Sequence, residues 1–317
     1  MKQLDWTATT IWSVRNDSKA RNLGIKKKKI RRSTLVKSDL ELLKFNRGNA
    51  KLGRDIWTFS LPAGFACPGA LECLSKANRE TGKITDGADT KFRCFAASDE
   101  AQYKNTRLQR WHNFELLKGK STAEMSELIQ ASLPRQAGII RVHVSGDFFN
   151  QFYFDAWMHV AKCQPLRTFY AYTKSLPFWL RRIGDIPKNF ALNASRGGIH
   201  DQLIEKHDLK YAEVVYSTKE AEDKKLEIDH DDSHAYKSGK PFALLIHGTQ
   251  PAGSIAAKAL SALRKIGWTG YSRKTVAAVA LCLVMMDGVP DKFWPVWARP
   301  GNENIISRIK IFGERNV

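Results

Sequence analysis

Short apolar runs alternate with amphipathic stretches along most of this chain. Residues 138–147 (GIIRVHVSGD) are rich in β-branched side chains and stop at a Gly-Asp turn, which predicts a buried strand. Residues 150–162 (NQFYFDAWMHVAK) then carry apolar side chains at helical spacing. Together the two segments predict a strand, a turn and a helix in succession.

The same alternation recurs and predicts an α/β fold. Strands that alternate with helices form parallel βαβ units, in either a doubly wound sheet or a barrel. Polar or glycine-containing turns follow the strands at their carboxyl ends, so we favour a parallel sheet closed or partly closed into a TIM-like barrel. Strands are expected at 55–62, 138–147, 167–173, 189–194, 212–216 and 242–247, and helices at 100–133, 150–162, 177–183, 202–207 and 254–266.

Positive charge is concentrated near the N-terminus. The 317 residues include 51 Lys and Arg against 32 Asp and Glu, which gives a net charge of +19. Residues 15–54 hold fourteen of the basic residues but only three of the acidic ones. The excess indicates a polyanionic partner, and nucleic acid is the natural one.

We therefore expect a basic N-terminal extension (1–53) and a barrel-like domain (54–317) with a polar excursion near 220–240. The most basic run of the extension is expected to contact phosphates, although it could instead be a solvated segment with no specific role. The residues in this run are Lys26, Lys27, Lys28, Lys29, Arg31 and Arg32.

No secretory signal or membrane span is expected. The start of the chain lacks an apolar stretch behind a basic cap. The most apolar run, 275–286, has about twelve residues, whereas a span needs about 20. We therefore expect a cytoplasmic protein, in which disulfides are unusual and the five cysteines bind metal, react or pack in the core.

Three cysteines form the main candidate for chemistry. Cys67 and Cys73 (CPGALEC) follow the predicted strand 55–62, and Cys94 (FRCF) comes twenty-one residues later. Three thiolates can hold an iron–sulfur cluster with one iron open, or a zinc ion with a fourth ligand. Their spacing does not identify the metal, and buried structural cysteines are the alternative. We expect Cys163 and Cys282 to be core residues.

Polar residues at strand ends give a second group of candidates. Strand alternation places Arg141, His143 and Ser145 on one face of their strand, although His143 could be a core residue. A Ser-Gly-Asp turn exposes backbone groups and a carboxylate that suit the ammonium of an amino-acid-like ligand or a metal ion. The candidate catalytic residues are His143, Asp147 and Lys174, and the candidate cofactor-binding residues are Ser145, Gly146, Asp147 and Ser195.

Two further segments admit more than one interpretation. Residues 229–234 (DHDDSH) could bind a divalent cation, but a solvated acidic loop or contacts with Lys or Arg suit them as well. Aromatic and basic residues are interleaved at 169–174 and 177–182, where most rings are expected in the core. Lys174, Arg181 and Arg182 are expected to be available, and both arginines could contact nucleic acid.

Several blocks of sequence resemble the gene product 88 family of phages and plasmids. These blocks are FSLPAGFACPGALEC, ITDGADTKFRC, RVHVSGDFFNQFYFDAW, FYAYTKSLPFW, ASRGG, IDHDDSHA and LIHGTQPAG, and they span about 57–252. Some members of that family carry the label of rolling-circle replication protein. That activity implies a His-hydrophobic-His metal motif and a tyrosine nucleophile, for which Tyr153, Tyr170 and Tyr172 are candidates. The chain has no such histidine pair.

A second resemblance is architectural. In radical S-adenosylmethionine (SAM) enzymes a cysteine cluster follows the first barrel strand, and a Gly-Gly-Glu-like turn after the second strand holds the methionine amino group. Here the cysteines and the turn 145–147 follow the first two strands in the same order, although the C-x-x-x-C-x-x-C spacing is absent and the acid is Asp147. The resemblance implies an iron–sulfur cluster and SAM as cofactors.

Two functions are compatible with these observations. One is an enzyme that binds an iron–sulfur cluster or zinc and acts on nucleic acid or a nucleotide. The other is a DNA-binding replication protein whose cysteines stabilise the fold.

Overall fold

A computed structural model describes residues 41–49, 51–268 and 270–271. The predicted phosphate-binding run 26–32, Cys282 and the apolar run 275–286 lie outside the described residues. Among those described, no helix is both long enough and apolar enough to cross a membrane.

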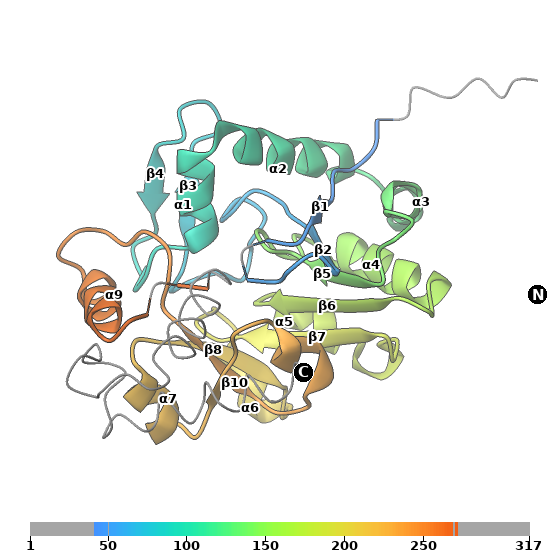
Figure 1. Ribbon diagram of the computed structural model, residues 1–317. Coiled ribbons are helices and arrows are strands. Elements are labelled where there is room, and N and C mark those ends of the chain that lie inside the picture. Colours follow the sequence, from blue (N-terminus) through green and yellow to red (C-terminus); the bar gives the residue numbers. More distant parts are fainter. Residues whose placement is uncertain (1–40, 50, 269, 272–317) are drawn as a thin grey trace, which may run out of the picture. The chain divides into compact units, whose positions relative to one another are not determined.

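The described residues form an eight-stranded, mostly parallel sheet and a small two-stranded sheet. The order in the large sheet is β1-β2-β5-β6-β7-β8-β10-β9, and β1, at one edge, is the antiparallel member (Figure 1). The small sheet pairs β3 with β4. The strands are β1 (Asn46–Arg47), β2 (Ile56–Phe59), β3 (Ser75–Ala77), β4 (Ile84–Asp86), β5 (Ile139–Val142), β6 (Thr168–Thr173), β7 (Phe190–Ser195), β8 (Tyr211–Val215), β9 (Glu227–Ile228) and β10 (Phe242–Leu245).

Helices fill most connections between the parallel strands. Ser121 caps α3 in a capping box with Glu124: the side chain of each accepts a hydrogen bond from the other's backbone N–H. The helices are α1 (Phe95–Gln102), α2 (Lys104–Leu117), α3 (Thr122–Ser132), α4 (Gln151–Cys163), α5 (Leu176–Leu180), the 3-10 helix η1 (Ile183–Asp185), α6 (Gln202–Lys206), α7 (Thr218–Asp223), α8 (Ser233–Lys237) and α9 (Ile255–Lys265).

Different helices pack on the two faces of the large sheet. Ile140 and Val142 of β5 pack with Trp157 of α4 in the largest hydrophobic cluster, on the face that α3 and α4 cover (Figure 1). Tyr170 and Phe242 belong to a separate, smaller cluster with Ala235 of α8. Alternation along β6 therefore supplies side chains to both faces, with Phe169 and Ala171 in the first cluster and Tyr170 in the second.

The predicted α/β class and its parallel sheet are confirmed. All six predicted strands are present, and β2, β5, β6, β7, β8 and β10 neighbour one another in chain order. Within the described residues no pairing joins β1 to β9, so the sheet there is not a closed barrel.

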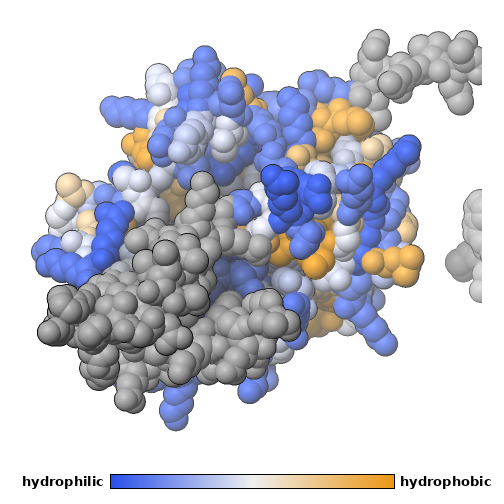
Figure 2. Space-filling view, viewed as in Figure 1, coloured by the Kyte–Doolittle hydropathy of each residue, from blue (hydrophilic) through white to orange (hydrophobic). Residues whose placement is uncertain are grey.

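The sequence did not predict how two polar segments join the fold. Residues 41–49 and 51–53, expected in the basic extension, supply β1 and the core residue Leu43. The polar excursion near 220–240 contains α7, β9 and α8, and α8 contacts β6 and β7. Figure 2 shows that hydrophilic residues dominate the described part of one face, with small apolar patches.

Candidate metal centre

The cysteine-bearing segment lies across the carboxyl ends of β2 and β5. The backbone N–H of Leu61 donates to the carbonyl of Ser145 at 2.8 Å, and that of Asp147 donates to the carbonyl of Ala66 at 2.9 Å. The N–H of Gly64 lies 3.3 Å from Cys67 Sγ. These bonds fix the loop that precedes Cys67 against the Ser-Gly-Asp turn.

The structure brings Cys67, Cys73 and Cys94 together beside Asp147. Burial raises the pKa of Cys67 well above its usual value, and the nearby charges of Asp147, Cys94 and Cys73 raise it further. Burial and the proximity of Cys73 raise the pKa of Cys94 to about 12. All three residues are half-buried and form no disulfide. A bound cation would oppose the burial and repulsion that raise the pKa of Cys67 and of Cys94.

The distances between metal-binding side chains differ between a single-ion site and an iron–sulfur cluster. In the described part of the chain, no three His, Cys, Asp or Glu side chains are arranged to hold a single metal ion. Thiolates around a tetrahedral zinc ion lie about 3.8 Å apart, given a Zn–S distance of about 2.3 Å. In a four-iron cluster each cysteine thiolate binds a different iron, so the thiolate sulfurs lie farther apart than around one zinc ion.

Asp147 is a buried carboxylate with three hydrogen-bond donors. Its Oδ1 accepts from the Thr173 hydroxyl at 2.6 Å and the Phe148 N–H at 2.7 Å. Its Oδ2 accepts from the Lys174 N–H at 2.7 Å. Burial raises its pKa to about 6, although these bonds favour the charged form. The carboxylate therefore joins the end of β5 to the end of β6.

Lys174 makes a similar connection from β6 to β7. Its ammonium donates to the carbonyls of Ser195 and Arg196 at 2.9 and 2.6 Å, and to the Ser195 hydroxyl at 2.8 Å. An ammonium has three N–H donors, so Lys174 has none left for a substrate in this arrangement. Ser195 lies at the same edge of the sheet as Asp147.

His143 does not lie where strand alternation placed it. The strand ends at Val142, and His143 has a φ of 74°, which reverses the direction of its side chain. Its Nε2 lies 2.9 Å from the hydroxyl of Tyr153 in α4, in the core, and its Nδ1 has no partner. Burial lowers its pKa to about 3. The prediction that His143 shares a face with Arg141 was therefore wrong.

A buried acid and arginine near the cysteines were missed by the sequence analysis. Glu100 of α1 accepts hydrogen bonds at Oε1 from the N–H of Ala63 and from Arg110, both at 2.8 Å, and the Ser145 hydroxyl lies 3.3 Å away. Its Oε2 is buried without a partner. Glu100 thus connects the loop before Cys67, the helix after Cys94 and the Ser-Gly-Asp turn.

The loop after β10 secures the third cysteine. The side chain of Gln250 accepts a hydrogen bond from the Arg93 N–H at 2.8 Å and donates to the Arg93 carbonyl at 3.1 Å. The rings of Phe95 and His247 lie 4.8 Å apart. The HGTQ block therefore holds the segment around Cys94, so these two motifs, which are distant in sequence, are in contact in the fold.

Residues 229–234 are neither a solvated loop nor free for a cation. Asp232 is fully buried and accepts hydrogen bonds from Arg141 at 2.7 Å, Tyr170 at 2.9 Å and Lys51 at 2.6 Å. Lys51 also pairs with Asp229 at 2.8 Å. Of the three interpretations, contact with Lys and Arg is the one that the structure bears out.

The tyrosines considered as nucleophiles are largely enclosed. Tyr153 and Tyr170 are fully buried, and burial raises the pKa of each, and that of Tyr172, well above its usual value. A phenol with a raised pKa is a poor nucleophile. Cys163, expected in the core, is exposed instead.

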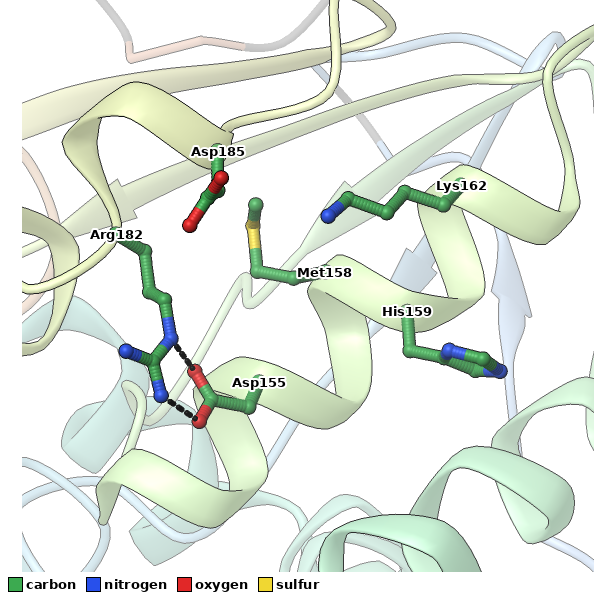
Figure 3. Close-up of a pocket in the computed structure, with 6 residues that line it drawn as sticks. All are labelled: Asp155, Met158, His159, Lys162, Arg182 and Asp185. Carbon is green, nitrogen blue, oxygen red and sulfur yellow. Dashed lines mark hydrogen bonds and ion pairs between the residues drawn. The ribbon is translucent and has the colours of Figure 1, made fainter. Parts of the chain in front are cut away.

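Arg181 and Arg182 directly follow α5. Arg182 forms a bidentate ion pair with Asp155 of α4, with distances of 2.8 and 2.9 Å (Figure 3). Arg181 is exposed and lies 3.3 Å from the Gln151 side chain. Arg182 and Asp155 border a surface pocket of about 240 Å³, which Met158, His159, Lys162 and Asp185 also line.

Comparison with known proteins agrees with one of the two resemblances. A model of the gene product 88 family matches residues 40–265, which is most of the chain. No curated protein and no solved structure matches, so the resemblance to radical SAM enzymes finds no support there. The matched range contains the cysteine segment, the Ser-Gly-Asp turn and the HGTQ loop. The chain belongs to the gene product 88 family.

Proposed function

We propose that this protein binds an iron–sulfur cluster through Cys67, Cys73 and Cys94 and acts on nucleic acid or a nucleotide. The observation that carries the proposal is the convergence of three cysteines from separate segments beside Asp147, at the carboxyl ends of parallel strands. Catalytic and cofactor sites in parallel α/β folds gather at that edge.

The three cysteines have the features of a cluster site rather than of core packing. As residues they are only half-buried, and Cys67 lies beside the carboxylate of Asp147. The charges of Cys73 and Cys94 raise the pKa of Cys67, as expected of thiols close enough to share one cluster. Three thiolates leave one iron of a four-iron cluster open to a second ligand.

SAM is the second ligand that we propose. Ser145, Gly146, Asp147 and Ser195 lie at the same edge and would hold it. A cluster with bound SAM supplies one-electron chemistry. Because Lys174 already donates three hydrogen bonds and His143 lies in the core, we propose no direct contact with substrate for either.

We further propose that the sheet curves into a partly closed barrel. The six parallel strands β2, β5, β6, β7, β8 and β10 follow one another in chain order. Right-handed crossovers then place connecting helices such as α4 on one face, as in TIM-like barrels, while α8 packs on the other face. Arg141 and Asp232 would lie on the inner face, where a buried ion pair needs protection from water.

Anaerobic purification tests the cluster. We expect brown protein with charge-transfer absorption and with iron and sulfide in similar amounts. The double variant Cys67→Ser, Cys73→Ser should lose colour and iron. Cys163→Ser, which changes an exposed cysteine of α4, is the matched control and should keep both.

Two other results would reject the proposal. Zinc without iron would indicate a single-ion site. Colourless, metal-free protein with steeply salt-dependent DNA binding would favour the alternative, a DNA-binding replication protein with structural cysteines, which the net charge of +19 supports. The replacement of Lys26 to Lys29 by serine should reduce the salt dependence by about 0.9 for each duplex phosphate that these lysines no longer neutralise.

A further inference from the structure

Two aromatic rings lie between two cations on the surface beside Cys67. The ammonium of Lys76 lies 5.3 Å from the ring centroid of Phe65. The ring centroids of Phe65 and Trp111 are 5.0 Å apart, and the guanidinium carbon of Arg79 lies 5.0 Å from the centroid of Trp111. We call these four side chains the cation–aromatic row.

Phe65 is the exposed aromatic ring of this row. It is 42% exposed, although a large aromatic side chain of a stable domain is usually covered. It stands two positions before Cys67, in a loop that hydrogen bonds hold against the end of β5. The ring is thus presented to solvent on a fixed backbone, which keeps the entropy cost of binding small.

A positive charge lies at each end of the cation–aromatic row. Lys76 is exposed, and among the described residues no carboxylate lies within ion-pair distance of it. Arg79 pairs with Glu115 at 3.0 Å and is 46% exposed. An ion pair at such exposure contributes little and can exchange for a phosphate.

We propose that single-stranded nucleic acid docks on the cation–aromatic row, with an unpaired base stacked on Phe65 and phosphates near Lys76 and Arg79. The inference rests on the proposed function. It adds that the nucleic acid is single-stranded and that it binds at the cation–aromatic row. Aromatic rings that stack on bases, with cations beside them, are typical of surfaces that bind single strands. A duplex hides the faces of its bases and does not fit an exposed ring. An acidic peptide matches the charge but offers no flat base.

The test measures binding of a fluorescent unstructured oligonucleotide to Phe65→Ala protein. Loss of one stacking ring should weaken binding about 5- to 100-fold. Phe152→Ala is the matched control, because Phe152 is 61% exposed on α4 and lies outside the row. Phe65→Leu keeps an apolar side chain in the loop and should weaken binding to a similar extent.

A charge variant gives an independent readout. Lys76→Ser should lower the salt dependence of single-strand binding by about 0.7, the value for one phosphate of a single strand that is no longer neutralised. Lys206→Ser, which changes an exposed lysine of α6, should leave it unchanged. DNA and RNA versions of the oligonucleotide identify the preferred backbone, and a polyglutamate peptide tests the competing partner.

The outcomes separate this inference from the proposed function. Equal binding by Phe65→Ala, Phe152→Ala and wild-type protein would overturn the inference, as would tighter binding of duplex DNA or polyglutamate. Iron is measured in every sample. Iron-free protein that still loses single-strand binding on Phe65→Ala would reject the cluster and support the row.

Discussion

Arg110 donates a hydrogen bond to Glu100 Oε1 at 2.8 Å, and both side chains are buried. A buried ion pair is costly to desolvate, and removal of one partner strands the other charge. The same guanidinium donates to the carbonyl of Ala96 at 2.7 Å, and the same carboxylate oxygen accepts from Ala63 N–H. The pair therefore links the segments that carry Cys67 and Cys94.

We expect Glu100→Ala to destabilise the protein strongly. The change removes the buried carboxylate that pairs with the Arg110 guanidinium and leaves the N–H of Ala63 without its acceptor, at a cost of about 3–5 kcal/mol in the free energy of unfolding. Glu100→Gln keeps an acceptor oxygen and should cost less. Urea unfolding measures both, with Glu127→Ala on the exposed side of α3 as control. Similar midpoints for Glu100→Ala and Glu127→Ala would contradict a structural role for this pair.

Gly146→Ala should also destabilise the candidate site. Gly146 has a φ of 82°, and an added Cβ would lie 2.6 Å from Cβ of Leu61. The strained backbone and the steric overlap both weaken the packing of the turn against the cysteine loop. We therefore expect the free energy of unfolding to fall by about 1–3 kcal/mol. Gly138→Ala is the control, since a Cβ there meets nothing within 4 Å. Thermal unfolding that shows equal effects at the two glycines would contradict this explanation.

Local patterns were sufficient to predict the parallel strands and the longer helices. The runs at 138–147 and 150–162 have clear periods, and β5 and α4 form within them. β1 and β9 have two residues each, too few to show a period. They exist because neighbouring strands supply hydrogen bonds, which is a tertiary effect.

The site was predictable only where residues near one another in sequence determine it. The cysteines and the Ser-Gly-Asp turn stand at strand ends, where the topology collects them. The partners of Asp232 could not be predicted, since Lys51 and Arg141 are 181 and 91 residues away. The reversal at His143 depends on a positive φ in a run of strand-forming residues, and no sequence pattern there indicates it.

His234 gives the protein a pH-dependent stability. Its ring nitrogens lie 3.0 Å from Asp229 and 2.9 Å from Glu227, and these carboxylates raise its pKa to about 9. The folded pKa exceeds the usual value near 6.5, so this stabilisation is complete below about pH 6.5 and is lost as the pH rises through 9. We expect a loss of about 1 kcal/mol, reduced by solvent screening.

Comparison with His234→Gln isolates this effect. Burial lowers the pKa of the nearby Lys210 to about 8, so its titration acts in the opposite direction above that pH. Both proteins contain Lys210, and the difference between their unfolding free energies removes its contribution. That difference should shrink between pH 6.5 and 9.5. A difference that stays constant would mean that His234 is neutral in the folded protein.

Lys174→Met separates a structural role of this lysine from a catalytic one. The ammonium joins the ends of β6 and β7 through Ser195 and Arg196, so methionine leaves the two carbonyls without their donor. We expect a loss of about 2–4 kcal/mol in the free energy of unfolding, measured with urea, together with less bound iron. The iron content should fall because the segment after Cys67 packs against Lys174: an added Cβ at Gly69 would overlap the Lys174 carbonyl and lie 3.1 Å from the Lys174 Cβ. Lys188→Met, at an exposed lysine before β7, should change neither quantity. Full stability and full iron content in Lys174→Met would show that the three hydrogen bonds do not hold the site, and would return Lys174 to the group of candidate catalytic residues.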